Sequence, residues 1–82
     1  MSANPKFPIY RKYPNNLSYF KILSRNRFEE IKKEHNGFRL YVFEAKLLPD
    51  FNLINDMIEM RDDHWDEIKS VEFEFLKLEL KN

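Results

Sequence analysis

The chain has 82 residues and a mass of 10.1 kDa, enough for one small hydrophobic core, so we expect a single domain over residues 1–82. Its one glycine excludes Gly-rich phosphate-binding loops, and its lack of cysteine excludes disulfides, thiolate zinc sites and a cysteine nucleophile. The net charge is zero, but the charges are unevenly distributed. Residues 1–46 hold ten basic and four acidic residues, whereas residues 47–82 hold four basic and ten acidic residues. This asymmetry indicates either two oppositely charged halves that pack together or a basic binding surface.

The N-terminal residues contain no apolar stretch of the kind that begins a secretory signal. No apolar run anywhere in the chain approaches the length of a membrane-spanning helix. We therefore expect a cytoplasmic protein that does not contact a membrane and whose residues 1–7 are flexible.

Two segments rich in aromatic and β-branched residues, 9–13 and 17–23, flank Pro14-Asn15-Asn16. Proline and asparagine favour a tight turn, so this pattern predicts a β-hairpin. We expect Tyr13 to lie opposite Leu17, a register in which Tyr10, Phe20 and Ile22 form the core face. The other face then carries two cations and two rings in alternation: Arg11, Tyr13, Tyr19 and Lys21.

The next segment reads as a helix. Ser24 is a suitable N-cap, Leu23 and Phe28 have the spacing of a hydrophobic staple, and Gly37 is suited to a left-handed cap at the C-terminal end. Beyond this helix, residues 38–46 are predicted as a strand, residues 51–60 as a short helix with Asp50 as its N-cap, and residues 64–68 as a short strand around the only tryptophan.

Residues 70–81 fit two patterns. Their apolar residues alternate as in a strand with one bulge, whereas as a helix they place Val71, Phe75 and Leu78 on one side and Phe73, Leu76 and Leu80 on the other. An internal comparison at an offset of 45 residues, which matches Phe28 to Phe73, favours the helix. A helix that is apolar on two sides needs a second partner, so we expect a homodimer with Phe75 and Leu78 at its interface.

These elements predict an α+β fold. We expect an antiparallel sheet made of the hairpin and two further strands, with helices packed on one face and the order ββα-βαβα. If the C-terminal segment is extended instead, it becomes another strand and can pair with a second chain.

The mixed cations and rings of Arg11, Tyr13, Tyr19 and Lys21 resemble a surface for single-stranded nucleic acid, although a solvated sheet face is the simpler interpretation. The densest ionisable cluster comprises Asp62, Asp63, His64, Asp66 and Glu67. It has the oxygen ligands of a metal site but lacks EF-hand spacing, and a solvated turn is the simpler interpretation. No serine has the flanking residues of a hydrolase nucleophile, so no catalytic residue is assigned.

The 13 aromatic residues exceed what a core of this size can bury, and aromatic side chains are favoured in protein interfaces. A binding face at Tyr13, Tyr19, Phe43 or Phe75 is one interpretation, and a ring-rich core with half-buried tyrosines is the other. We expect the protein to be a non-catalytic protein–protein interaction or regulatory module that forms a homodimer. We expect it to bind no cofactor and no metal. The alternatives are single-stranded nucleic-acid binding and a small metal-dependent enzyme that uses residues 62–67.

Overall fold

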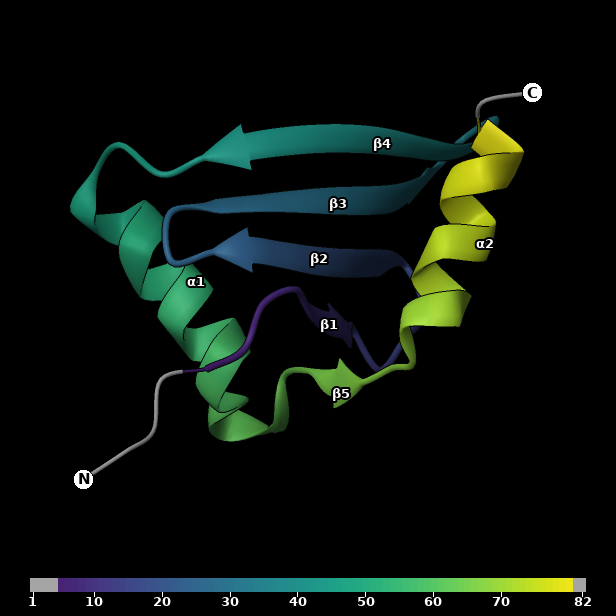
Figure 1. Ribbon diagram of the computed structural model, residues 1–82. Helices are drawn as coiled ribbons and strands as arrows, with labels where there is room; N and C mark the ends of the chain where they lie inside the picture. The colour runs from purple at the N-terminus through teal and green to yellow at the C-terminus, as the bar shows by residue number, and fades with distance from the viewer. Residues whose placement is uncertain (1–4, 81–82) are drawn as a thin grey trace.

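The computed structural model describes residues 5–80 and shows a five-stranded sheet with two α-helices (Figure 1). The strands are β1 (Ile9–Lys12), β2 (Ser18–Ser24), β3 (Arg27–Glu34), β4 (Gly37–Glu44) and β5 (Asp66–Glu67). The helices are α1 (Leu48–Glu59), α2 (Ser70–Leu80) and a short 3-10 turn, η1 (Arg61–Asp63). The predicted α+β class and the predicted C-terminal helix are both confirmed.

The sheet is entirely antiparallel and has the order β4-β3-β2-β1-β5. The first four strands follow one another in a meander, and each pairs with its neighbour in sequence. After α1 and η1 the chain enters β5, which pairs with β1 so that Arg11 lies opposite Glu67. Strand β4 is therefore an edge strand of eight residues.

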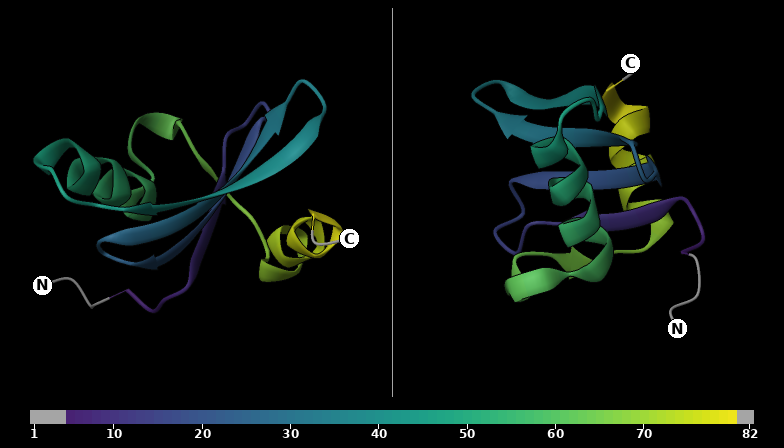
Figure 2. Two further views of the ribbon diagram at one scale, coloured as in Figure 1. Left: turned by 90° about the horizontal axis from the view of Figure 1, so that it is seen from above. Right: turned by 90° about the vertical axis from the view of Figure 1, so that its left-hand side faces the viewer.

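The two helices lie on opposite faces of this sheet, as Figure 2 shows from above. Side chains alternate between the faces along each strand. Phe20, Ile22 and Phe28 form one buried cluster with Ile54 and Met57 of α1, and we call their side of the sheet the α1 face. The residues between them on β2 and β3 point to the opposite side of the sheet, which we call the α2 face. The expectation that the helices share one face is thus wrong.

The predicted helix after Ser24 is also wrong, because those residues form β3. Its two apolar residues are three positions apart, so the strand directs Phe28 to the α1 face and Ile31 to the α2 face. Each is buried because a helix covers each face, which removes the alternation that normally marks a strand. Gly37 does adopt a positive φ of 123°, but it does so at the β3–β4 hairpin. The element order is consequently ββββ-α-β-α.

The N-terminal hairpin exists, but its register differs by one residue from the expected one. Tyr13 pairs with Ser18 rather than Leu17, since its amide donates a hydrogen bond of 3.0 Å to the Ser18 carbonyl oxygen. Asn16 adopts the left-handed conformation in this turn, with φ of 63°, which asparagine tolerates better than most residues. A shift of one residue reverses the faces of β1 relative to β2.

The remaining elements lie close to their predicted positions. The strand expected over 38–46 is β4, and the helix expected over 51–60 is α1, which begins three residues earlier at Leu48. Asp50 is not the expected N-cap, because the helix begins earlier and Leu47 holds that position. From within the first turn, the Asp50 carboxylate instead accepts hydrogen bonds from the amides of Lys46 and Leu47. The strand expected over 64–68 shortens to β5. Of the expected flexible residues, 1–4 lie outside the described part, and Phe7 packs against the core.

Candidate interaction surfaces

Helix α2 is apolar on two sides, as its sequence predicts. Its inner side carries Phe73, which is completely buried. Its outer side carries Val71, Phe75 and Leu78, whose exposed fractions are 55%, 64% and 62%. These three residues are four and three positions apart and so form one continuous stripe along the helix. We call this set the outer stripe.

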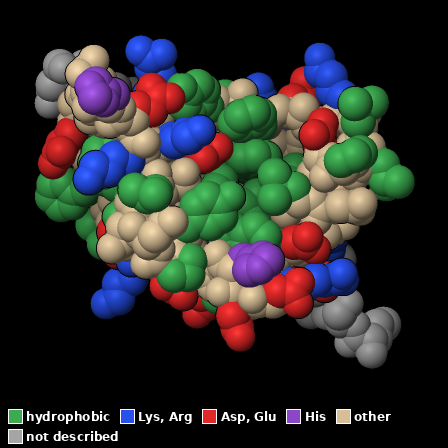
Figure 3. Space-filling model, turned by 180° about the vertical axis from the view of Figure 1, so that it is seen from behind, with side chains coloured by type: hydrophobic (Ala, Val, Ile, Leu, Met, Phe, Trp, Pro, Cys, Tyr) green, Lys and Arg blue, Asp and Glu red, His purple; other side chains and the backbone are tan. Residues whose placement is uncertain are grey.

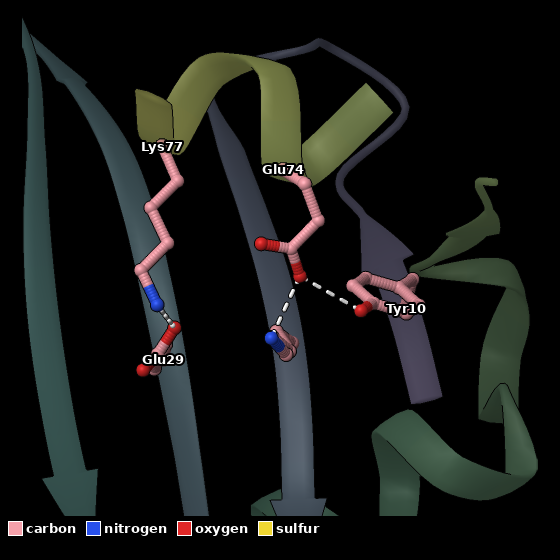
Figure 4. A network of polar contacts seen from close by, with 5 residues as sticks. Tyr10, Glu29, Glu74 and Lys77 are labelled. Atoms are coloured by element: carbon pink, nitrogen blue, oxygen red, sulfur yellow. Dashed lines mark hydrogen bonds and ion pairs between the residues drawn. The ribbon is translucent and has the colours of Figure 1, made fainter. Parts of the chain in front are cut away.

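Polar contacts hold α2 in this orientation (Figure 4). One Glu74 oxygen accepts hydrogen bonds from the Tyr10 hydroxyl at 2.8 Å and from Lys21 Nζ at 2.7 Å. One turn further along, Lys77 Nζ forms an ion pair of 2.9 Å with Glu29 of β3. The ring of Phe73 lies 5.8 Å from the ring of Tyr10. Because these contacts all involve the inner side, the outer stripe cannot turn toward the sheet.

The charges of this network support one another. Hydrogen bonding to Lys21 holds the pKa of Glu74 below its ordinary value, and the same bond raises the pKa of Lys21. Burial, together with the bond to Glu74, raises the pKa of Tyr10. All three groups therefore stay in the protonation states that the network requires over a wide range around neutral pH.

Arg11, predicted as part of a nucleic-acid surface, is instead used inside the fold. Its side chain is only 11% exposed and donates to the carbonyl oxygens of Met57 at 2.9 Å and Ile58 at 3.2 Å. These carbonyls belong to the last turn of α1, where backbone acceptors lack partners and the helix dipole favours a positive charge. Burial lowers the pKa of Arg11, and the nearby Glu67 opposes this effect.

The other three predicted surface residues are divided between the faces. Tyr13 packs on the α1 face against Phe20, with ring centroids 5.2 Å apart. Tyr19 and Lys21 lie on the α2 face, where Tyr19 contacts Phe38 edge-on and Lys21 is occupied by Glu74. The structure thus does not bring the four residues into the single patch on which the nucleic-acid alternative depends.

The acidic segment 62–67 does not converge on a point. Asp62 and Asp63 belong to η1, both with positive φ, while Asp66 and Glu67 belong to β5. Within residues 5–80, no three histidine, aspartate or glutamate side chains are grouped as metal ligands. Within the described part of the chain, residues 62–67 are thus not brought together as metal ligands.

The α1 face contains a feature that the sequence only partly indicates. Between β3, β4 and α1 is a cavity of about 170 Å³, and Figure 3 shows apolar side chains gathered around a hollow on this side of the molecule. We call it the aromatic hollow. Its rings are those of Tyr13, Phe20, Phe28 and Phe43. Aromatic content suggested Tyr13 and Phe43 as interface residues, but only the hairpin register and the β3–β4 pairing bring the four rings together.

Comparisons of the chain with models of protein families, with curated proteins and with solved structures found no match. Neither α1 nor α2, the helices of the described residues, is long and apolar enough to cross a bilayer.

Proposed function

We propose that this protein is a non-catalytic interaction module that forms a homodimer through the outer stripe of α2. The observation that carries the proposal is the exposure of Val71, Phe75 and Leu78, each more than half accessible on a helix whose inner side is already packed. Contiguous exposed apolar surface is a common mark of an interaction site. We place this activity in the cytoplasm, because a chain without cysteine needs no oxidising compartment.

A second copy is the partner that fits the stripe best. Two antiparallel α2 helices related by a twofold axis would place Phe75 against Phe75 of the second copy and Val71 against Leu78 of the second copy. The stripe is therefore complementary to itself, as an isologous interface requires. One helix face is small beside the roughly 1,200–2,000 Å² of stable interfaces, so we expect a weak dimer with a Kd on the order of 10–100 μM.

Analytical ultracentrifugation across a concentration series tests the proposal. Phe75→Glu and Leu78→Glu are expected to raise the dimer Kd at least about thirtyfold, because each introduces two charges into a desolvated contact. Leu48→Glu is the matched control, since Leu48 is 71% exposed but lies on α1, on the opposite face of the sheet. Circular dichroism melts verify that each variant folds. A wild-type protein that remains monomeric at 500 μM, a concentration about fivefold above the weakest expected Kd, contradicts the proposal.

A further inference from the structure

The aromatic hollow holds a carboxylate in an unusual position. Glu30 lines it, on the α1 face of β3, with Phe20 and Tyr41 opposite it on the neighbouring strands. Its side chain is half-buried and accepts a hydrogen bond of 2.8 Å from the buried Ser18 hydroxyl. Within residues 5–80 no lysine, arginine or histidine forms an ion pair with it. Glu30 is thus a partly exposed carboxylate without a cationic partner, and a cation supplied from outside can pair with it.

The rings beside Glu30 favour the same kind of ligand. Phe43 stacks on Phe28 with centroids 5.0 Å apart and is 44% exposed, so part of its surface faces solvent. Tyr13 and Glu30 line the same cavity, and burial together with the charge of Glu30 raises the pKa of Tyr13. Aromatic faces attract ammonium and guanidinium groups through the quadrupole of the ring. Apolar rings and an unpaired carboxylate in one cavity thus match an organic cation.

The edge strand next to the hollow indicates where such a cation would come from. Within the described residues β4 pairs only with β3, and Figure 1 shows no further strand along its outer edge. Its free backbone groups can accept an additional extended segment. Side chains alternate along a strand, so a residue of that segment paired with Phe43 would project onto the α1 face, where the hollow lies.

We propose that the aromatic hollow binds a lysine or arginine side chain of a partner polypeptide that adds to the edge of β4. Glu30 pairs with the cationic head, and the rings of Phe43 and Tyr13 contact it and its aliphatic stem. This site lies on the face opposite the outer stripe, so it is separate from the proposed dimer interface, and either can exist without the other.

The experiment is a titration of the isotope-labelled protein with the peptide acetyl-Thr-Val-Lys-Val-Thr-amide, followed by amide chemical shifts. We expect shifts confined to β4 and to the residues of the hollow. The same peptide with norleucine in place of lysine is expected to bind roughly tenfold more weakly, because it retains the shape without the charge. Blocked lysine alone is also expected to bind more weakly, because it cannot pair with the edge strand. Equal affinity of the norleucine peptide overturns the cation site, and equal affinity of blocked lysine overturns the strand addition.

Matched variants test the named residues. Glu30→Gln is expected to remove most of the tenfold preference for lysine, whereas Glu72→Gln, the same change on the exposed surface of α2, leaves it intact. Phe43→Leu is expected to weaken binding severalfold, and Phe38→Leu, the same change on the other face of β4, has little effect. Repeating the titration with Leu78→Glu, which is designed to stay monomeric, separates this site from the dimer. Shifts that map to α2 instead contradict the assignment.

Discussion

Lys21 of β2 and Glu74 of α2 lie 53 residues apart in the chain and form an ion pair of 2.7 Å. This contact joins the second helix to the middle of the sheet. It also fixes which side of α2 remains exposed, because Glu74 cannot reach Lys21 unless Phe73 faces inward. The exposure of the outer stripe thus depends on a polar contact on the other side of the helix.

The ion pair makes the stability of the fold sensitive to acid. Because the pKa of Glu74 lies below its ordinary value of 4.5, its contribution is complete above that pH and is lost as the pH falls through the folded-state pKa. The Glu74 side chain is 39% exposed, so solvent screening limits the contribution to about 1 kcal/mol. Urea unfolding from pH 7 to pH 2 is expected to show a difference between wild type and Glu74→Gln at neutral pH that disappears in acid. A difference that persists at pH 2 contradicts this assignment.

At alkaline pH, the dependence of the free energy of unfolding on pH has the opposite sign. Lys21 and Tyr10 have pKa values raised above 10.5 and 10.0, so their contributions are complete below those values and are lost as the pH rises through the folded-state pKa values. Tyr10→Phe removes the phenol and is expected to lower the free energy of unfolding by about 1 kcal/mol at pH 7. It should also reduce the loss of stability above pH 10. Tyrosinate absorbance near 295 nm measures the titration directly, with Tyr10 ionising later than a solvent-exposed tyrosine.

Arg11 distinguishes a structural role from a nucleic-acid one. Arg11→Lys preserves the charge but cannot donate to the Met57 and Ile58 carbonyls from two nitrogen atoms, so we expect a loss of about 1–2 kcal/mol in the free energy of unfolding. Hydrogen exchange should become faster in the last turn of α1. Lys12→Arg on the other face of β1 is the control. Unchanged stability in Arg11→Lys contradicts the capping role.

The proposed dimer has a specific response to salt. Glu72 and Glu79 are seven positions apart and border the same side of the outer stripe, so in an antiparallel pair they face each other across the interface. Screening of these two like-charge pairs is expected to tighten the dimer about two- to fivefold between 0.05 M and 1 M NaCl. The double variant Glu72→Gln/Glu79→Gln should flatten this dependence. Weakening of the wild-type dimer by salt contradicts the antiparallel arrangement.

Strand β3 shows why part of the fold could not be predicted from the sequence. Phe28 and Ile31 have helical spacing, and with Ser24 and Gly37 as caps they predicted a helix, although Asn36-Gly37 is a dipeptide typical of hairpin turns. A strand buried on both faces needs no strict alternation, and the sequence does not reveal that the two helices cover opposite faces. The same uncertainty affected the hairpin, where one residue of register moved Arg11 from solvent to the end of α1.

Helix α2 was predicted correctly, but the argument that favoured it was wrong. The comparison that matched Phe28 to Phe73 assumed two helices, and the structure has a strand at the first position and a helix at the second. The division of apolar residues between two sides did not itself favour a helix over a strand, but it follows from helical geometry once the segment is helical. That division also located Phe75 and Leu78 in the exposed set. The aromatic hollow required contacts between distant strands, which no local pattern provides.

The strand order also shapes how the chain reaches its native state. Pairing of β1 with β2, β2 with β3 and β3 with β4 needs only short turns, so these steps have a low entropy cost of loop closure. Pairing of β5 with β1 joins Arg11 to Glu67 and must wait until a long intervening segment is ordered. We therefore expect the four-stranded meander to form early and the docking of β5 and α2 to complete folding late.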